Sequence, residues 1–389
     1  MSALSATAAG SVAREGAAGR ALEPRLYLDP LVLAREQRAI FSRTWQLAGH
    51  VGDLPVPGSY LTAQAGDQPV LVVRDEDGGL RAFRNVCRHR GSRLLAGAGT
   101  AKKAIRCRYH GWTYRLDGSL VGVPEARTYE GLDKSCLGLH PARVETFEGL
   151  VFVNLDLDAP ALGERLAGLR ERLAPYGIAD LERFGPYTAG DDGDSPRAHS
   201  QPANWKVVVD NYLEGYHVPI AHPGLMRMFD YQRYETELGE DWIWVEAPFR
   251  DKPSSNRAER LYRRAAHPMP GLGEDARNVW RYAFIYPNTT IDLYPDQVNT
   301  WQMVPAGVAR TRDVWGIYRH PRCGPVTRLA QRLNLRLNGD VLNEDIEIVD
   351  NVQRGLASEG YECGPLSRRE EAVAWFADRV RRDLGRGRE

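Results

Sequence analysis

The sequence has no long apolar run. Every apolar stretch falls short of the ~20 residues that a membrane-spanning helix requires, so an integral membrane protein is not expected. Charge of one sign is not in excess either, because 51 Lys and Arg residues balance 51 Asp and Glu residues. Without a basic stripe or a block of like charges, we do not expect nucleic acid or other polyanions as partners.

Cysteine is also scarce. The chain has five cysteines, which are Cys87, Cys107, Cys136, Cys323 and Cys363. They are too few and too scattered for a disulfide framework. This usage fits a reducing compartment in which some cysteines bind metal, so we expect a cytoplasmic protein.

Changes in periodicity divide the 389 residues into four parts, enough for two domains. Residues 1–22 are rich in Ala, Gly and Ser and predict a disordered leader, with an organelle transit peptide as the alternative. Residues 23–45 predict a helical segment that packs on the last domain. Residues 46–156 predict a small all-β domain of short strands. Residues 157–389 start with a helical connector and continue with aromatic and β-branched runs that suit an antiparallel sheet.

Turn signals add detail to this division. Asp-Gly-Gly at residues 77–79 and Asp-Gly at residues 117–118 each separate two apolar runs and predict two hairpins. Residues 251–275 are rich in charge, Gly and Pro, and we expect a loop over one side of the second domain.

Two short motifs in the all-β part pair a cysteine with a histidine. The first is Cys87-x-His89, and the second, after a gap of seventeen residues, is Cys107-x-x-His110. Four-coordinate zinc uses sets of two Cys and two His. A [2Fe–2S] cluster of the Rieske type uses two Cys on one iron and two His on the other. Because each loop carries one ligand of each kind, each loop can supply one ligand to each iron, which favours the Rieske arrangement over zinc.

A second candidate metal site begins on a predicted helix from Asn204, its N-cap, to just past His217. Pro219 is expected to end this helix. On an unbroken helix His217 and His222 would diverge by roughly 140°. A break between them lets the second imidazole turn back toward the first. Glu214, three residues before His217, is expected on the same helical face.

A carboxylate is needed to complete a two-His-one-carboxylate iron site. Residues 342–356 predict a helix whose apolar stripe contains Asp345, while Glu344, Glu347 and Asp350 are expected to point away. An ionised carboxylate on a buried face is costly unless it is paired or binds metal. Helical geometry therefore favours Asp345 among these four acids.

These motifs resemble those of a known family. Residues 85–91 and 107–114 look like the two cluster loops of Rieske non-haem iron oxygenase α subunits, and residues 204–222 look like their mononuclear iron motif. The likeness covers nearly all of the chain after the leader. It implies an α+β fold, with a small all-β Rieske domain and a helix-grip (START-like) catalytic domain. It also implies one [2Fe–2S] cluster and one mononuclear Fe(II) per chain, with O2 as co-substrate.

The resemblance also implies partners. The family's carboxylate at the position of Glu214 links the iron-bound His217 to a cluster His, here His110, of a neighbouring subunit, which implies a head-to-tail ring and most simply a homotrimer. Many members have Asp here, so Glu is a departure. Neither a Gly-x-Gly-x-x-Gly fingerprint nor a plant-type ferredoxin cysteine run is present. Electrons from NAD(P)H are therefore expected through a separate reductase, with or without a ferredoxin.

The favoured function is oxygen insertion into a small organic substrate. Glu-Gly-Tyr-His at residues 214–217 and the acidic stretch at residues 344–356 resemble choline, betaine and carnitine monooxygenases, which hydroxylate a carbon beside a quaternary nitrogen. Hydroxylation of an aromatic ring or aromatic acid is the alternative. An electron carrier without oxygenase activity, and a redox-inactive ligand-binding protein, are the remaining hypotheses.

Overall fold

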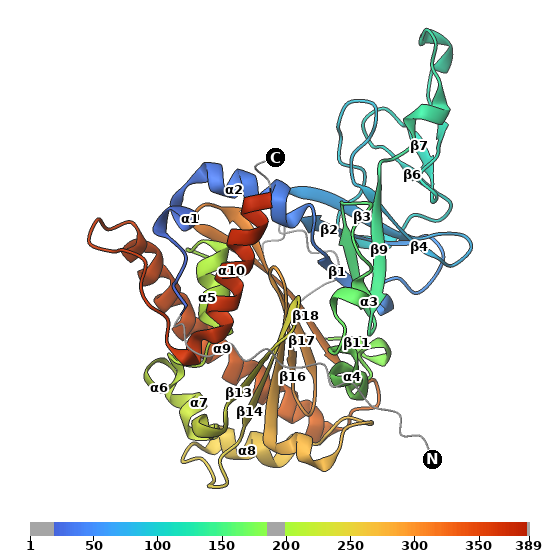
Figure 1. Ribbon diagram of the computed structural model, residues 1–389. Coiled ribbons are helices and arrows are strands. Elements are labelled where there is room, and N and C mark those ends of the chain that lie inside the picture. The colour runs from blue at the N-terminus through green and yellow to red at the C-terminus, as the bar shows by residue number, and fades with distance from the viewer. Residues whose placement is uncertain (1–18, 185–198, 387–389) are drawn as a thin grey trace, which may run out of the picture.

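The computed structural model describes residues 19–184 and 199–386 (Figure 1). Most of the expected leader, residues 1–18, lies outside this part. Residues 19–22 are folded, because Ala21 N–H donates to Gly364 O at 3.1 Å and Leu366 N–H donates to Gly19 O at 2.8 Å. Leu22 is buried as well. Residues 19–22 therefore do not belong to a disordered leader, and the remaining domain boundaries stay predictions.

The first domain contains two antiparallel sheets. The larger sheet has the strand order β1-β10-β9-β4-β3-β2-β5, and the smaller has the order β6-β7-β8. The bounds are β1 (Gln46–His50), β2 (Ser59–Ala65), β3 (Gln68–Arg74), β4 (Leu80–Arg84), β5 (Ala98–Thr100), β6 (Ala104–Arg106), β7 (Thr113–Arg115), β8 (Leu120–Gly122), β9 (Pro141–Phe147) and β10 (Leu150–Asn154). Both predicted hairpins are confirmed, as β3–β4 and β7–β8.

The second domain has one large antiparallel sheet with the order β11-β18-β17-β16-β15-β14-β13, and β12 also pairs with β18. The bounds are β11 (Glu182–Arg183), β12 (His199–Gln201), β13 (Glu235–Leu238), β14 (Trp242–Pro248), β15 (Val279–Ile285), β16 (Thr289–Leu293), β17 (Val298–Gly307) and β18 (Arg310–Arg319). The aromatic and β-branched runs of the sequence form four of these strands, β14 to β17. The expected α+β class is confirmed.

Helices cover both faces of this sheet, with α5 and α10 on one side and the connector helices α3 and α4 on the other (Figure 1). The bounds are α1 (Pro24–Leu28), α2 (Pro30–Glu36), α3 (Leu162–Arg165), α4 (Arg170–Leu173), α5 (Trp205–Leu213), α6 (Val218–Ala221), α7 (Pro223–Met228), α8 (Arg257–Ala265), α9 (Pro325–Leu356) and α10 (Glu371–Arg386). A five-residue π-helical turn, Gln37–Phe41, continues α2. In the described residues no helix combines the length and the apolar character needed to cross a bilayer.

The N-terminal helices are anchored to α5 by a buried ion pair. Lys206 Nζ lies 2.6 Å from Glu36 Oε1, and both side chains are fully buried. Trp205 Nε1 donates to the other oxygen of Glu36 at 2.9 Å. Phe41 and Phe376 of α10 each make a T-shaped contact with the Trp205 ring, with centroids 5.0 Å and 5.6 Å away. Helix α5 is therefore held between the first and the last helices of the chain.

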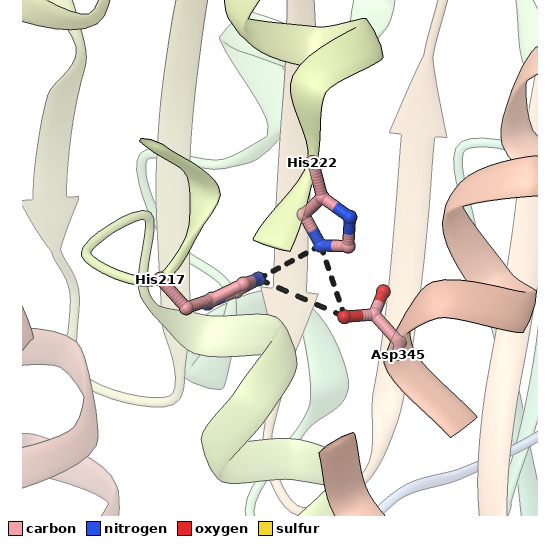
Figure 2. A group of neighbouring side chains, drawn as sticks. All are labelled: His217, His222 and Asp345. Carbon is pink, nitrogen blue, oxygen red and sulfur yellow. Dashed lines mark hydrogen bonds and ion pairs between the residues drawn. The ribbon is translucent and has the colours of Figure 1, made fainter. Parts of the chain in front are cut away.

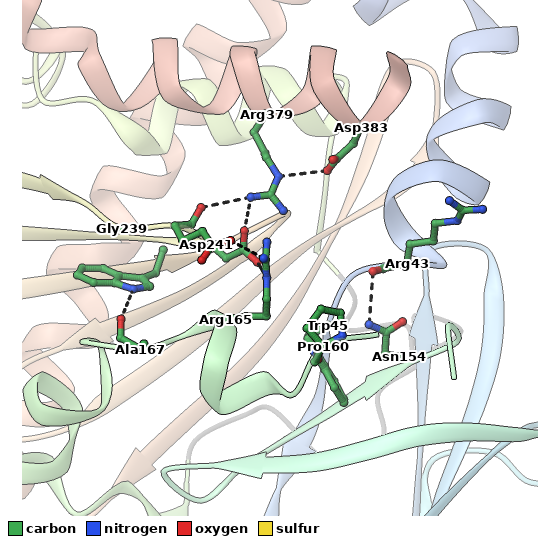
Figure 3. A network of polar contacts seen from close by, with 12 residues as sticks. Arg43, Trp45, Asn154, Pro160, Arg165, Ala167, Gly239, Asp241, Arg379 and Asp383 are labelled. Atoms are coloured by element: carbon green, nitrogen blue, oxygen red, sulfur yellow. Dashed lines mark hydrogen bonds and ion pairs between the residues drawn. The ribbon is translucent and has the colours of Figure 1, made fainter. Parts of the chain in front are cut away.

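A polar network ties the connector to the sheet and to α10 (Figure 3). Asp241, in the turn between β13 and β14, accepts hydrogen bonds from Arg165 of the connector and Arg379 of α10. Trp242 Nε1 donates to Ala167 O at 2.9 Å. Nearby, Trp45, which directly precedes the first domain, donates from its Nε1 to Pro160 O of the connector at 3.1 Å.

Two expectations about helices were wrong. Helix α5 ends at Leu213, four residues before His217, and Pro219 lies in the first turn of α6 instead of ending α5. Glu214 is extended, with φ −127° and ψ 152°. Residues 251–275 are not only a loop, because they contain α8, whose N-cap Asn256 accepts N–H groups at the start of the helix.

Candidate metal centres

The two Cys-His motifs form a pair of matching loops. In the first loop, Cys87 N–H donates to Ser92 O at 2.8 Å and Gly91 N–H donates to Cys87 O at 3.1 Å. In the second, Cys107 N–H donates to Trp112 O at 2.8 Å and Gly111 N–H donates to Cys107 O at 3.0 Å. The same two backbone bonds recur at the same offsets, so each cysteine sits at the base of an equivalent turn.

Each turn closes on a glycine in the left-handed region. Gly91 has φ +72° and Gly111 has φ +73°, which side chains rarely adopt. A Cβ at Gly91 would meet nothing within 4 Å. The glycine is therefore favoured there by its backbone conformation.

The side chains in these loops face one another. The rings of His89 and His110 lie with centroids 4.6 Å apart, and His89 stacks on Trp112 at 4.8 Å. Both cysteines are buried. Nδ1 of His89 is buried without a hydrogen-bond partner. A buried, unpartnered imidazole nitrogen is costly in a folded protein unless it binds something, and a metal fits it.

The surroundings favour thiolate at Cys107 only, because burial raises the pKa of the Cys87 thiol. Burial opposes ionisation of Cys107, but the backbone N–H groups of Tyr109 and His110 outweigh it and lower the pKa of this thiol. Tyr114, which sequence reasoning missed, places its hydroxyl 3.3 Å from Cys87 Sγ and accepts the Arg88 N–H at 3.0 Å. Hydrogen bonds to cluster sulfurs are a recognised means of setting the reduction potential.

The four side chains do not converge on one ion. Among the described residues, the one group of three or more His, Cys, Asp or Glu side chains whose ligand atoms come together closely enough for a single ion is elsewhere, at His217, His222 and Asp345. A tetrahedral zinc site would draw two thiolates and two imidazoles into such a group. A wider, two-iron cofactor fits Cys87, His89, Cys107 and His110 better.

His217, His222 and Asp345 meet between α5, α6 and α9 (Figure 2). Nε2 of His222 lies 3.0 Å from Nε2 of His217 and 3.0 Å from Asp345 Oδ1, and Nε2 of His217 lies 3.7 Å from the same oxygen. Ligands about 2.1 Å from a metal and roughly at right angles are about 3 Å apart. The structure therefore brings together the three residues singled out from the sequence, at the spacing of one metal ion.

The protons on the two imidazoles are held away from this triangle. Nδ1 of His217 lies 2.6 Å from Glu214 Oε1, and Nδ1 of His222 lies 2.7 Å from Glu344 Oε2. A carboxylate acceptor keeps the proton on Nδ1 and leaves a lone pair on Nε2. Two lone pairs and an anionic oxygen then face each other, which is repulsive unless a cation lies between them. The donor set fits a divalent metal.

Glu344 corrects an expectation, because it does not point away from the site. It shares the metal-facing side of α9 with Asp345 and contacts His222 directly. Burial would lower the pKa of His222, but hydrogen bonds and charge from Asp345 and Glu344 outweigh burial and raise it. The sequence offered no signal beyond the adjacency of Glu344 to Asp345.

A cavity of about 980 Å³, including its open mouth, leads to this triangle. Its walls come from α5, α6, α7, α9 and five strands of the sheet. Eight aromatic side chains line it: Tyr212, Phe229, Tyr234, Tyr282, Phe284, Tyr294, Trp301 and Trp315. Concave, mostly apolar sites with a few polar groups are typical of small-molecule binding.

Within one chain the two candidate centres lie at opposite ends. The small sheet β6–β8, which adjoins the Cys-His loops, is at the upper right of Figure 1, whereas α6 and the His217 site are at the lower left. Electron transfer between cofactors at these two places would have to cross the length of the molecule or pass between subunits.

Comparison with known proteins agrees with this geometry. Residues 187–386 match the family model for the ring hydroxylating α subunit (catalytic domain), and residues 44–147 match that for the Rieske [2Fe–2S] domain. The chain therefore belongs to the Rieske non-haem iron oxygenase α subunits, the terminal oxidoreductase components that carry a Rieske [2Fe–2S] domain and a catalytic iron domain.

Within this family it is related to quaternary ammonium monooxygenases. It is 31% identical to the carnitine monooxygenase oxygenase subunit of Acinetobacter baumannii, over 86% of this chain and 85% of that protein. It is 31% identical to the chloroplastic choline monooxygenase of Arabidopsis thaliana, over 90% of this chain and 79% of that protein. A solved quaternary ammonium Rieske monooxygenase, described with carnitine oxidation and inter-subunit electron transfer, superimposes with a TM-score of 0.79, 28% identity and coverage of 94% and 95%.

Proposed function

We propose that this oxygenase hydroxylates a carbon beside the nitrogen of a small quaternary ammonium compound, with electrons supplied from NAD(P)H by a separate reductase. The observation that carries the proposal is the aromatic cavity that ends on the His217, His222 and Asp345 triangle. Aromatic faces attract quaternary ammonium groups through cation–π interactions. The related carnitine and choline monooxygenases support the same substrate class.

The ligand assignment is part of the proposal. Cys87 and Cys107 would hold one iron of the cluster, and His89 and His110 the other. His217, His222 and Asp345 would hold the catalytic iron and leave positions open for O2, whose activation is the chemistry this metal supplies. Glu214 and Glu344 keep a proton on Nδ1 of each histidine, and the aromatic walls hold substrate near the metal and exclude water.

Glu214 is proposed to have a second role as an electron bridge to His110 of a neighbouring subunit. Its carboxylate already accepts from Nδ1 and from the backbone N–H of His217, and from the N–H of Tyr216. Tyr216 and Ile220 beside this site are exposed, and so is Tyr109 beside His110. Apolar side chains exposed at both centres fit a head-to-tail ring, most simply a trimer, in which each first domain docks on the next second domain.

The test is a substrate panel with purified enzyme, a reductase and NADH. We expect about three irons per chain, as the two cofactors require, a Rieske absorption spectrum, and O2 uptake coupled to formation of a hydroxylated or dealkylated product from a quaternary ammonium compound. Coupled turnover of an aromatic acid instead would favour the alternative substrate class. Zinc in place of the cluster would refute the oxygenase mechanism.

Asp345→Ala separates the two centres. Because Asp345 supplies the only anionic oxygen of the triangle, we expect loss of the catalytic iron and of turnover, with the Rieske spectrum unchanged. Iron analysis and visible absorption measure both in one sample. Activity equal to the wild type would refute the assignment of Asp345.

A further inference from the structure

One acidic side chain in the cavity has no assigned role. Asp292 of β16 is 6% exposed and lines the same cavity as the metal triangle. The Tyr212 hydroxyl donates to Asp292 Oδ1 at 2.7 Å. Among the described residues no Lys or Arg forms an ion pair with Asp292. A buried carboxylate whose protein partners are neutral hydroxyl groups lacks a counter-ion.

The rest of the cavity lining carries no positively charged side chain that could serve as the counter-ion of Asp292. The cavity is lined by no Lys and no Arg in the part of the chain that the structure describes, and its two histidines are those assigned to iron. Its other polar groups are two further carboxylates, Glu214 and the proposed iron ligand Asp345, and neutral groups, which are the tyrosine hydroxyls and the amides of Asn211, Asn299 and Asn338. The side chains that line the cavity are therefore acidic, and away from the metal at the triangle a bound anionic group would find no opposite charge.

The aromatic rings around Asp292 are nearly perpendicular to one another. Tyr212 lies at 88° to Tyr282 with centroids 6.4 Å apart, and at 78° to Trp301 with centroids 5.7 Å apart. Tyr282 lies at 87° to Tyr294. Rings at right angles can turn faces toward one cation from several sides, the arrangement that recognises quaternary ammonium groups. Burial raises the pKa of Asp292 to about 6, so the carboxylate is ionised at neutral pH.

We propose that Asp292 is the counter-ion of the substrate, and that the cavity selects a cation whose nitrogen is its only charged group. The proposal rests on the proposed function and narrows it. A zwitterion such as carnitine or betaine would bring a carboxylate into a cavity with no Lys or Arg and with Asp292 nearby. A cationic amino alcohol such as choline adds only a hydroxyl, which the asparagine amides and tyrosine hydroxyls can bond.

Binding can be tested without turnover, because Trp301 and Trp315 line the cavity and report occupancy by fluorescence. The probes are choline, its uncharged isostere with a tert-butyl group in place of trimethylammonium, glycine betaine and carnitine. With the oxidised enzyme we expect choline to bind about tenfold or more tighter than each of the other three, as expected for a charge pair formed out of water.

Asp292→Asn removes the charge and keeps the shape. We expect this variant to bind choline about tenfold or more weakly and the uncharged isostere as the wild type does. Asp296→Asn is the matched control, since Asp296 is also buried and lies between β16 and β17 but does not line the cavity and bonds Tyr262, which does not line it either. Its choline affinity should not change.

Three results would overturn the inference: a zwitterion that binds as tightly as choline, no measurable choline binding by enzyme with both cofactors, or equal losses for choline and the isostere in Asp292→Asn. If the second domain of that variant does not fold, as judged by its circular dichroism and its content of catalytic iron, the wild-type comparison decides alone. The oxygenase proposal is judged separately, by iron content and coupled O2 uptake, and can survive each of these results.

Discussion

At the scale of single residues, the carboxylates behind the histidines determine how well the site can hold iron. Glu344 fixes the Nδ1 proton of His222 from the same helix that carries Asp345. Losing such a partner typically lowers metal affinity 10- to 100-fold. We expect this loss in Glu344→Ala, measured by competition between apo-enzyme and a chelator for Fe(II). Glu347→Ala, an exposed acid on the same helix, is the control and should bind iron normally.

A buried acid on β18 predicts a pH effect on stability. Asp313 accepts hydrogen bonds from Trp301 Nε1 and Gln201 Nε2, and burial raises its pKa to about 7. An unfolded Asp has a pKa of about 3.9, so between pH ~4 and ~7 the native state holds a proton that the unfolded state releases. The contribution of Asp313 to stability therefore falls as the pH rises through this window and stays low above it.

Asp313→Asn removes this titration. The stability of the variant relative to the wild type should rise between pH 5 and pH 8, by at most about 4 kcal/mol over the whole window. Urea unfolding of both proteins at the two pH values measures the difference. An equal difference at pH 5 and pH 8 would show that Asp313 does not titrate as described.

The sequence predicted some of these residues and not others, for physical reasons. Asp345 could be found because a charge on an apolar helical stripe is conspicuous at a period of 3.6 residues. Asp292 could not, since every residue of β16 is buried and alternation does not distinguish its two faces. Tyr114 was missed because tyrosine is common in buried strands. Its role depends on the position of its hydroxyl group next to Cys87, which only the folded structure shows.

At the scale of elements, the strands and hairpins were predictable, because turn residues and β-branched runs act locally. The end of α5 was not. The Glu214 carboxylate accepts the N–H groups of Tyr216 and His217, which a continuing helix would donate to carbonyl groups one turn earlier. The burial of α9 also differs from a simple apolar stripe, because Val352 is exposed whereas Gln353 is buried and accepts the Asn204 N–H at 2.7 Å.

The Glu36–Lys206 pair gives a prediction about how α2 and α5 hold together. Removing one partner of a buried ion pair leaves a charge without compensation and typically costs about 3–5 kcal/mol. We expect Glu36→Ala to lower the free energy of unfolding by this amount, measured by urea unfolding followed by circular dichroism. Adding Lys206→Met removes the orphaned charge and should restore much of the loss. No recovery in the double variant would contradict this account.

At the scale of the whole molecule, the separation of the two centres in Figure 1 makes assembly part of the proposed chemistry. If Glu214 carries electrons between subunits, Glu214→Gln should keep both cofactors and the oligomer but reoxidise its reduced cluster on the order of 100-fold more slowly with O2 and substrate. Stopped-flow absorption of the cluster measures this rate. Iron content and light scattering are the controls, because Glu214 also orients His217.

If Glu214→Gln contains both cofactors and its cluster is reoxidised as fast as in the wild type, Glu214 is not part of the electron-transfer path. If light scattering shows that the wild-type protein is a monomer, the proposed ring does not exist, and electrons have to travel within one chain.

The pairing of residues 19–22 with residues 364–366 has a consequence for biosynthesis. Residues 19–22 find their partners in nearly the last part of the chain, and α5 is enclosed by helices from both ends. The first domain has all its strands soon after residue 154 has left the ribosome and can form while translation continues. The second domain cannot complete its fold until α10 has emerged. A nascent chain therefore passes through a stage in which the Rieske domain can be folded while the catalytic domain is incomplete.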